Sequence, residues 1–256
     1  MKKNLIFTSI FFILSNTLFG YGTAGSASKH EPRYIVDMPT AGLLRNLNFA
    51  LNSQLVSNGG FLFDATFAFF NFINVGICYG GSGVIGSETM NLQSIPGFHL
   101  KGRILDETQT SPALVLGINT QGKGRYFHDK KRYEQLSPGF YAAVSKSYTW
   151  QLGDIAVHGG MNYTFEDPNN RGINFYAGAE HTIYKYATAI IEINPNFNDS
   201  HSAIWKDKPF MLNGAIRFGI SSNSTVEIQF KDFLRSSKFS TEVGRFFGIE
   251  FISKIK

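Results

Sequence analysis

The sequence predicts an all-β protein, a closed antiparallel up-and-down transmembrane β-barrel of about 12 strands. Three observations predict this fold. Apolar and polar residues alternate with a period of two along most of the chain, no apolar run after residue 20 is long enough for a membrane-spanning helix, and long links alternate with short ones. The chain then divides into a signal peptide over residues 1–22, a short N-terminal periplasmic segment over 23–42 and a single barrel over 43–256.

The N-terminus has the order of charged, apolar and small residues typical of a secretory signal peptide. Lys2 and Lys3 are basic, residues 5–18 are almost wholly apolar, and small residues follow at Gly20, Gly22, Ala24, Gly25 and Ala27. The apolar stretch is shorter than the roughly 20 residues of a membrane-spanning helix. We therefore expect cleavage between residues 20 and 27, export through the inner membrane, and a mature protein in the bacterial outer membrane.

The composition is that of a β-rich chain with no second class of domain. It has 256 residues, 26 of them glycine, with 15% aromatic and 17% charged residues. The formal charge of +5 includes Lys2 and Lys3, so the mature chain carries 5 − 2 = +3, which is too weak to indicate a nucleic-acid partner. Cys78 is the single cysteine, so no intramolecular disulfide is expected and we interpret it as a small strand residue.

The first predicted strand shows the alternation clearly, because its odd positions are mostly apolar and its even positions include Asn46, Asn48, Asn52 and Gln54. The same period recurs in further segments along the chain. The twelve predicted strands are residues 43–55, 61–69, 74–80, 98–104, 113–120, 139–148, 155–163, 173–181, 187–194, 211–220, 224–231 and 245–252. Many approach the nine to eleven residues that cross a tilted barrel wall, and an even number closes without free edges.

The polar face separates a membrane barrel from a soluble β-sandwich. A sandwich would have an apolar inner face and a charged outer face. Here the polar members are mainly Asn, Gln, Thr and Gly with isolated charges, opposite Phe, Ile, Leu, Val and Ala. This arrangement favours a hydrogen-bonded or wet lumen inside a lipid-facing wall. Alternation alone also fits a half-exposed soluble sheet or a lipocalin-like barrel.

The links between the predicted strands alternate in length. Long links cover residues 81–94, 121–138, 195–210 and 232–244, and short links cover 71–73, 106–111, 149–154, 182–185 and 221–223. Long and short links therefore lie at opposite rims, as in outer-membrane barrels. The short first link, residues 56–60, is the exception.

A search for catalytic motifs supports no enzyme. The glycine-rich residues 80–83 lack the Lys and the helix of a phosphate-binding loop, and His158-Gly159-Gly160 lies within a strand without a nucleophile elbow. Ser145, His158 and Asp154 can be assembled into a triad on paper, but a chain of this length permits many such choices. The histidines show no metal-ligand spacing, so we expect no catalytic residue, no metal and no cofactor.

Charged residues on the polar faces are the best functional candidates. The lumen-facing candidates are His99, Lys101, Arg103, Glu180, Glu192, Arg217 and Glu227. Opposed basic and acidic rows would set the ion preference of a pore or bind a charged polymer. As structural residues they would instead pair across a narrow lumen, and we slightly favour this interpretation because buried charge must be compensated.

Several short segments resemble the YjbH-like outer-membrane proteins. They are Pro39-Thr40-Ala41-Gly42-Leu43, Val75-Gly76 with Tyr79-Gly80, Pro96-Gly97, Lys101 with Leu105-Asp106-Glu107, residues 112–117, Ala143-Val144-Ser145-Lys146, and His158-Gly159-Gly160 with Asn162-Tyr163. The resemblance implies a barrel associated with exopolysaccharide export or surface assembly. A small passive, porin-like channel is the alternative, and an outer-membrane lipid-modifying enzyme is a distant third. Expected partners are outer-membrane lipid, the barrel assembly machinery, and polysaccharide or export partners.

Overall fold

The computed structural model describes residues 28–255 except 57–58, 87–88, 167–171, 184–185, 200–201, 203, 207–208 and 240–241. The predicted signal peptide and its cleavage point lie outside the described residues. The wall strands are β1 (Asn48–Val56), β2 (Gly60–Phe69), β3 (Ile73–Ser82), β5 (Gly97–Leu105), β6 (Ala113–Asn119), β9 (Gly139–Trp150), β10 (Gly153–Tyr163), β11 (Asn174–Thr182), β12 (Ala187–Asn194), β13 (Met211–Gly219), β14 (Ser224–Lys231) and β15 (Gly244–Lys254).

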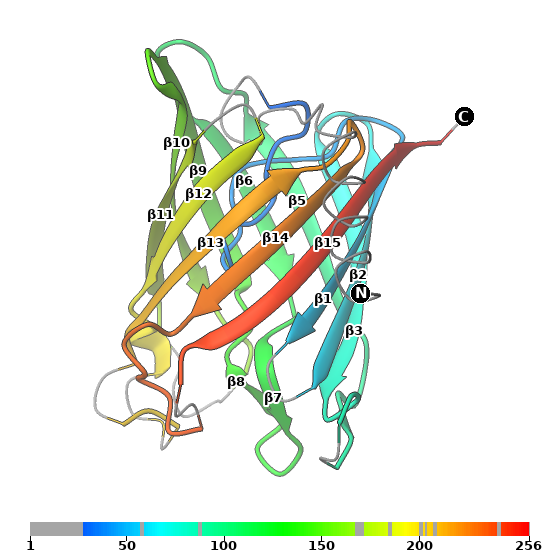
Figure 1. Cartoon of the computed structure of the whole chain (residues 1–256), viewed down its shortest axis with the longest axis vertical. Helices are drawn as coiled ribbons and strands as arrows, with labels where there is room; N and C mark the ends of the chain where they lie inside the picture. The colour runs from blue at the N-terminus through cyan, green and yellow to red at the C-terminus, as the bar shows by residue number, and fades with distance from the viewer. Residues whose placement is uncertain are drawn as a thin grey trace, which may run out of the picture.

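These twelve strands of the described chain form a closed antiparallel up-and-down transmembrane barrel (Figure 1). Each strand pairs with its neighbours in sequence order, and β1 closes the wall against β15, with Asn52 opposite Glu250. The two-residue strand β4 (Asn91–Leu92) extends the wall at the end of β3. A separate hairpin of β7 (Lys123–Phe127) and β8 (Arg132–Gln135) lies in the link after β6, and η1 (Phe197–Asp199) lies in the link after β12.

The alternation of residue types determines which side chains face outward. On β3, Val75, Ile77 and Tyr79 are exposed, whereas the residues between them are buried. Ile77 is 61% exposed and Leu116 on β6 is 52% exposed, whereas Glu192 on the inward phase of β12 is 0% exposed. An apolar surface of this kind is stable only against lipid, and closure leaves every strand paired. The predicted fold class is therefore confirmed.

The links segregate by length to the two rims, as predicted. The links that follow β3, β6, β10, β12 and β14 are long and define the long-link rim, which in Figure 1 lies at the bottom, beside β7 and β8. The links that follow β2, β5, β9, β11 and β13 are short and define the opposite, short-link rim, which also carries the C-terminal end of β15. The link between β1 and β2 is short and remains the exception. Within the described residues, no helix combines the length and the hydropathy needed to cross a membrane.

The structure differs from the sequence prediction before β1. The alternation predicts a first strand from residue 43, but pairing begins at Asn48, and Leu47 has a positive φ of 58° that turns the chain out of the wall. Residues 28–46 enter the barrel from the short-link rim and form what we call the N-terminal hairpin. Leu43 and Leu44 belong to this hairpin and are buried inside the barrel rather than facing lipid. The described part of the predicted periplasmic segment, residues 28–42, thus lies within the barrel.

Candidate functional site

The N-terminal hairpin reverses direction deep in the lumen. The Ile35 N–H donates to the Met38 carbonyl over 2.8 Å, and the Thr40 N–H donates to the Arg33 carbonyl over 3.1 Å. Two backbone hydrogen bonds cannot satisfy all peptide groups of a buried segment, and each unsatisfied group is costly. The barrel wall supplies the missing partners, strand by strand.

Glu192 on β12 binds the tip of the hairpin. Its Oε2 accepts the N–H groups of residues 36, 37 and 38 over 2.9, 2.8 and 2.8 Å, and its Oε1 accepts the Asn213 amide over 2.9 Å. Three convergent N–H groups form a concave anion-binding nest. This carboxylate is therefore compensated by peptide dipoles of the hairpin.

Lys101 on β5 binds backbone carbonyl groups of the hairpin. Its Nζ donates to the carbonyl oxygens of Arg33, Thr40 and Gly42 over 3.0, 3.0 and 3.2 Å. These three acceptors use all the donors of an ammonium group. Glu192 therefore holds hairpin N–H groups while Lys101 holds hairpin carbonyl groups.

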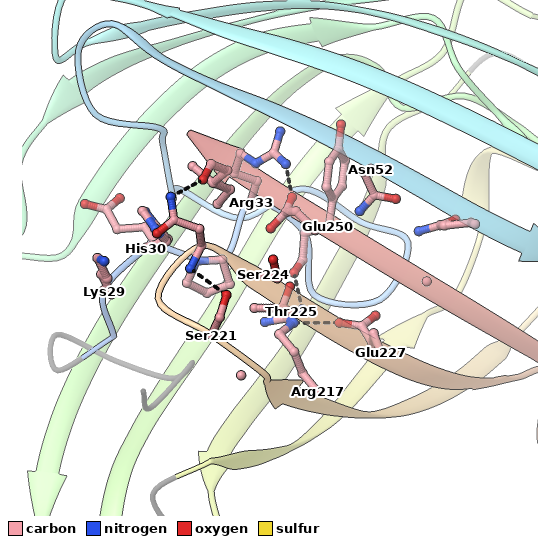
Figure 2. A pocket seen from close by; sticks show the side chains of 18 of the residues that line it. Lys29, His30, Arg33, Asn52, Arg217, Ser221, Ser224, Thr225, Glu227 and Glu250 are labelled. Carbon is pink, nitrogen blue, oxygen red and sulfur yellow. Dashed lines mark hydrogen bonds and ion pairs between the residues drawn. The ribbon is translucent and has the colours of Figure 1, made fainter. Parts of the chain in front are cut away.

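Two arginines join the hairpin to the acidic residues of β11, β14 and β15 and to Thr66 of β2. Arg33 of the hairpin pairs with Glu250 and donates to Thr66 Oγ1 over 2.5 Å. Arg217 on β13 pairs with Glu227 over 2.6 Å and with Glu180 over 3.2 Å. The same guanidinium donates to the carbonyls of residues 34 and 35 over 3.3 and 3.2 Å. Figure 2 shows Arg33 pointing toward Glu250 and Arg217 pointing toward Glu227.

Further contacts fix the depth of the tip. Asp37 pairs with Lys231 on β14 over 2.5 Å, and the Tyr176 hydroxyl on β11 donates to the Pro39 carbonyl over 2.9 Å. Ile35 fits against Gly178, where an added Cβ would lie 2.6 Å from the Ile35 Cγ2. A side chain at position 178 would therefore displace the tip.

All seven lumen candidates lie on the inward phase of their strands, but they do not meet as predicted. The expected pairing of the Lys101 and Arg103 row with Glu180 and Glu192 is not among the described ion pairs. Arg103 instead pairs with Glu31 of the hairpin and donates to the Ala41 carbonyl over 2.7 Å. His99 contacts Asp64 over 2.8 Å. The basic row and the acidic row were expected to neutralise each other's charge. The hairpin instead lies between them and binds residues of both rows.

The long-link rim is covered by interlocked loops. Arg132 on β8 forms a two-bond ion pair with Asp199 over 2.8 and 2.7 Å, and the Trp205 indole donates to the same carboxylate over 2.7 Å. Glu166 accepts the N–H groups of residues 133 and 137 over 2.7 and 2.8 Å. Burial raises the pKa of Glu166 above its ordinary value. These bonds join the links after β6, β10 and β12.

The short-link rim is open by comparison. A cavity of about 640 Å³ lies between the hairpin and the inner wall, lined at the rim by residues 106–109 and deeper by Ser145, His158 and Glu180. A second cavity of about 340 Å³ lies beside Arg45 and Asn223. These two cavities therefore form a vestibule at the short-link rim.

The candidate triad of Ser145, His158 and Asp154 is only partly formed in the structure. The Ser145 hydroxyl and His158 Nδ1 lie 2.7 Å apart across β9 and β10, and His158 Nε2 lies 3.6 Å from Glu180. Asp154 instead accepts the Thr149 hydroxyl over 2.6 Å. Ser145 Oγ also accepts the Ala41 N–H over 2.9 Å, so the hairpin already uses the hydroxyl as an acceptor.

Comparisons with known proteins show the fold alone. No protein-family description and no curated protein matches the sequence. A KdgM porin in complex with disordered oligogalacturonate has a similar fold, with a TM-score of 0.50, 10% identity, and coverage of 80% of this chain and 98% of that chain. The Acinetobacter baumannii outer membrane protein Omp33 aligns with a TM-score of 0.45, 9% identity and coverage of 82% and 100%. The NanC porin aligns with a TM-score of 0.45, 9% identity and coverage of 81% and 100%. The resemblance to YjbH-like proteins stays a prediction.

Proposed function

We propose that this protein is a porin-like channel of the bacterial outer membrane, held closed by its own N-terminal hairpin. The observation that carries the proposal is how the hairpin is bound: Glu192, Lys101 and Arg217 hold its backbone through polar bonds. Apolar packing also contributes, since the hairpin tip clusters with Tyr176, Ile190 and Ala215, but a segment that only filled a core would not need polar bonds to three wall strands. A wall that remains polar once the segment leaves is suited to water and solutes.

The arrangement of charge supports the same function. Lys101 and Arg103 lie on β5, and Glu180, Glu192 and Glu227 lie on β11, β12 and β14, several strands further along the closed sheet. With the hairpin removed, basic and acidic rows would face the same water-filled space. Such rows orient and select charged solutes.

Conductance in planar bilayers tests this proposal. The mature chain should open rarely, whereas a variant in which residues 28–44 are deleted should conduct continuously. Shortening the β7–β8 turn at residues 128–131 is the matched control, because it removes exposed residues of another hairpin and leaves both Arg132 and the N-terminal hairpin in place. A hairpin-deleted barrel that folds, judged by heat-modifiable gel mobility, and conducts no more than the mature chain would contradict the proposal.

For the solute, we propose a carboxylate-bearing oligosaccharide as the first to test. One porin of similar fold was studied with oligogalacturonate, and Lys101 and Arg103 would offer cations to such a polymer once the hairpin leaves. Liposome swelling with the hairpin-deleted variant should be faster with oligogalacturonate than with a neutral oligosaccharide of equal length. Equal rates would remove the acidic solute from the proposal.

A role in exopolysaccharide export or surface assembly rests on the YjbH-like resemblance alone. Because the hairpin lies inside the barrel, a polymer that crosses the lumen would have to displace it. Deletion in the native host, with measurement of secreted polysaccharide, tests this role directly. The same host would show whether outer-membrane insertion depends on the barrel assembly machinery, as we propose. A lipid-modifying activity is the least supported, because Ser145 and His158 face the lumen rather than lipid.

A further inference from the structure

Three metal-ligating side chains converge on the inner wall beside the hairpin. Asp64 on β2 lies opposite Cys78 on β3 in the strand register, and His99 on β5 lies opposite Gly76. An added Cβ at Gly76 would lie 2.3 Å from His99 Nε2, so this glycine makes room for the imidazole to reach Asp64. The three residues therefore meet only because of this register.

The ligand atoms are close enough to share one ion. Cys78 Sγ lies 3.0 Å and His99 Nε2 lies 2.8 Å from the same oxygen, Asp64 Oδ2. One ligand atom from each residue lies within 4.8 Å of the others. Zinc binds thiolate, imidazole and carboxylate ligands at about 2.0–2.3 Å, so neighbouring ligand atoms are about 3–4 Å apart. The observed separations of 2.8 and 3.0 Å are close to this spacing.

A cavity beside these residues contains buried oxygen atoms that lack a hydrogen-bond donor. It has a volume of about 30 Å³ and is lined by Asp64, Cys78, Gln54 and Gln121 among others. Gln54 Oε1 and Gln121 Oε1 are buried and have no hydrogen-bond partner among the described residues, and their side chains belong to residues 9% and 5% exposed. Buried acceptors of this kind are costly unless a donor reaches them. The cavity is large enough for a water molecule, which needs about 10–15 Å³.

We propose that Asp64, Cys78 and His99 bind Zn²⁺, with a water molecule as the fourth ligand. The water would donate its two protons to the orphaned oxygens of Gln54 and Gln121. Binding breaks the Cys78 S–H bond, the thiolate keeps the electron pair as it forms the Zn–S bond, and that proton leaves to solvent. His99 Nε2 gives up the proton that it shares with Asp64, and the ring carries its remaining proton on Nδ1, so a neutral imidazole binds the ion through the Nε2 lone pair. No oxidation or reduction takes place.

Nearby cations do not exclude this site. Arg33 lies 3.9 Å from Asp64, but its guanidinium is already paired with Glu250. Lys123 also lines the cavity. The thiolate formed on binding adds one negative charge and, together with Asp64, balances the two charges of the zinc ion. The proposal does not depend on the channel function, and its test uses no conductance measurement.

The test uses the full mature chain, both folded in detergent and refolded with the metal present, because refolding gives the ion access to a site that is buried afterwards. Co²⁺ is the spectroscopic probe, since a thiolate ligand produces a charge-transfer band in the near ultraviolet. Zn²⁺ retained after gel filtration should reach one ion per chain. Cys78→Ser should abolish the cobalt band and weaken binding at least about 100-fold, and Gln121→Leu should weaken it about 10-fold through the lost water contact.

His158→Gln is the matched control, because it removes another buried histidine from the inner wall and should leave binding unchanged. Folding of each variant is judged by heat-modifiable mobility. If Cys78→Ser does not fold, His99→Gln and Gln121→Leu decide the question. No ion retained by either loading route, or equal binding in the folded ligand variants, would overturn the proposal.

Discussion

Replacing Glu192 by glutamine should release the tip of the N-terminal hairpin. In the wild type one carboxylate oxygen accepts three N–H groups from residues 36–38. Hydrogen bonds to charged groups contribute about 1.5–3 kcal/mol each and neutral ones about 0.5–1.5 kcal/mol. Over three bonds the loss is about 3 kcal/mol, part of which is offset because a neutral amide is cheaper to bury than a carboxylate.

The introduced amide also lacks a partner for its donors. With its oxygen on the hairpin, the NH₂ group of the new side chain would face the Asn213 NH₂, which in the wild type lies 2.9 Å from Glu192 Oε1. Asn213 cannot simply rotate, because its Oδ1 accepts the Asp232 N–H over 2.9 Å. An unsatisfied donor costs about 1–3 kcal/mol. The net destabilisation of the bound hairpin is therefore about 3 kcal/mol, or roughly 100-fold in its equilibrium.

Hydrogen exchange measures this equilibrium directly. The amides of residues 36–38 should exchange roughly 100-fold faster in Glu192→Gln, while the amides of β10 and β11 stay protected. Glu166→Gln is the matched control, since Glu166 also accepts two backbone N–H groups but lies in the loops of the long-link rim, away from the hairpin. A change below about threefold at residues 36–38 would refute the assignment of Glu192 as the anchor of the hairpin.

Three further predictions concern the wall, the closed sheet and the rim. Leu51→Arg should impair assembly by about 2–4 kcal/mol because Leu51 faces lipid. Asn52→Arg should be tolerated, because Asn52 faces the lumen beside Glu250 and Asp64. Equal assembly yields of the two variants would show that the assignment of lipid-facing and lumen-facing positions on β1 is wrong. The protein should fractionate with outer membranes and migrate differently before and after boiling, and recovery from the soluble periplasm would contradict a membrane barrel. His30 of the N-terminal hairpin lies 3.2 Å from the Ser222 carbonyl at the short-link rim, and burial lowers the pKa of His30 below its ordinary value. Its contribution to the free energy of unfolding should therefore be present at pH about 7 and lost as the pH falls toward about 5. His30→Gln should flatten the measured pH dependence of thermal unfolding.

The strands could be predicted because a lipid-facing wall imposes a strict period of two. Each wall strand requires apolar residues at every second position, whatever the rest of the protein does. β12 illustrates this: its predicted bounds, residues 187–194, are those of the structure. The inward phase of Glu192 follows from the same period.

The contacts inside the barrel could not be predicted in the same way. Glu192 and Lys101 bind backbone groups of the hairpin, which every residue type carries, so the sequence of the hairpin gives no signal of these contacts. The Asp64 cluster is equally hidden, because its members are separated by 14 and 35 residues and meet through strand register. The β7–β8 hairpin was missed because its strands of 5 and 4 residues are too short to show alternation.

The position of the hairpin at the start of the chain determines when it can dock during folding. Its anchors lie far away in sequence: the Val36 bond to Glu192 spans 156 residues and the Asp37 pair with Lys231 spans 194. Contacts of such high order form slowly, because the entropy of closing a long loop is lost before the contact stabilises anything. Segments of the chain that are synthesised first must therefore wait for β12 to β14. The wall itself closes through a pairing of similar order, Asn48 with Lys254, so docking of the hairpin and closure of the barrel both belong to the last stage of folding.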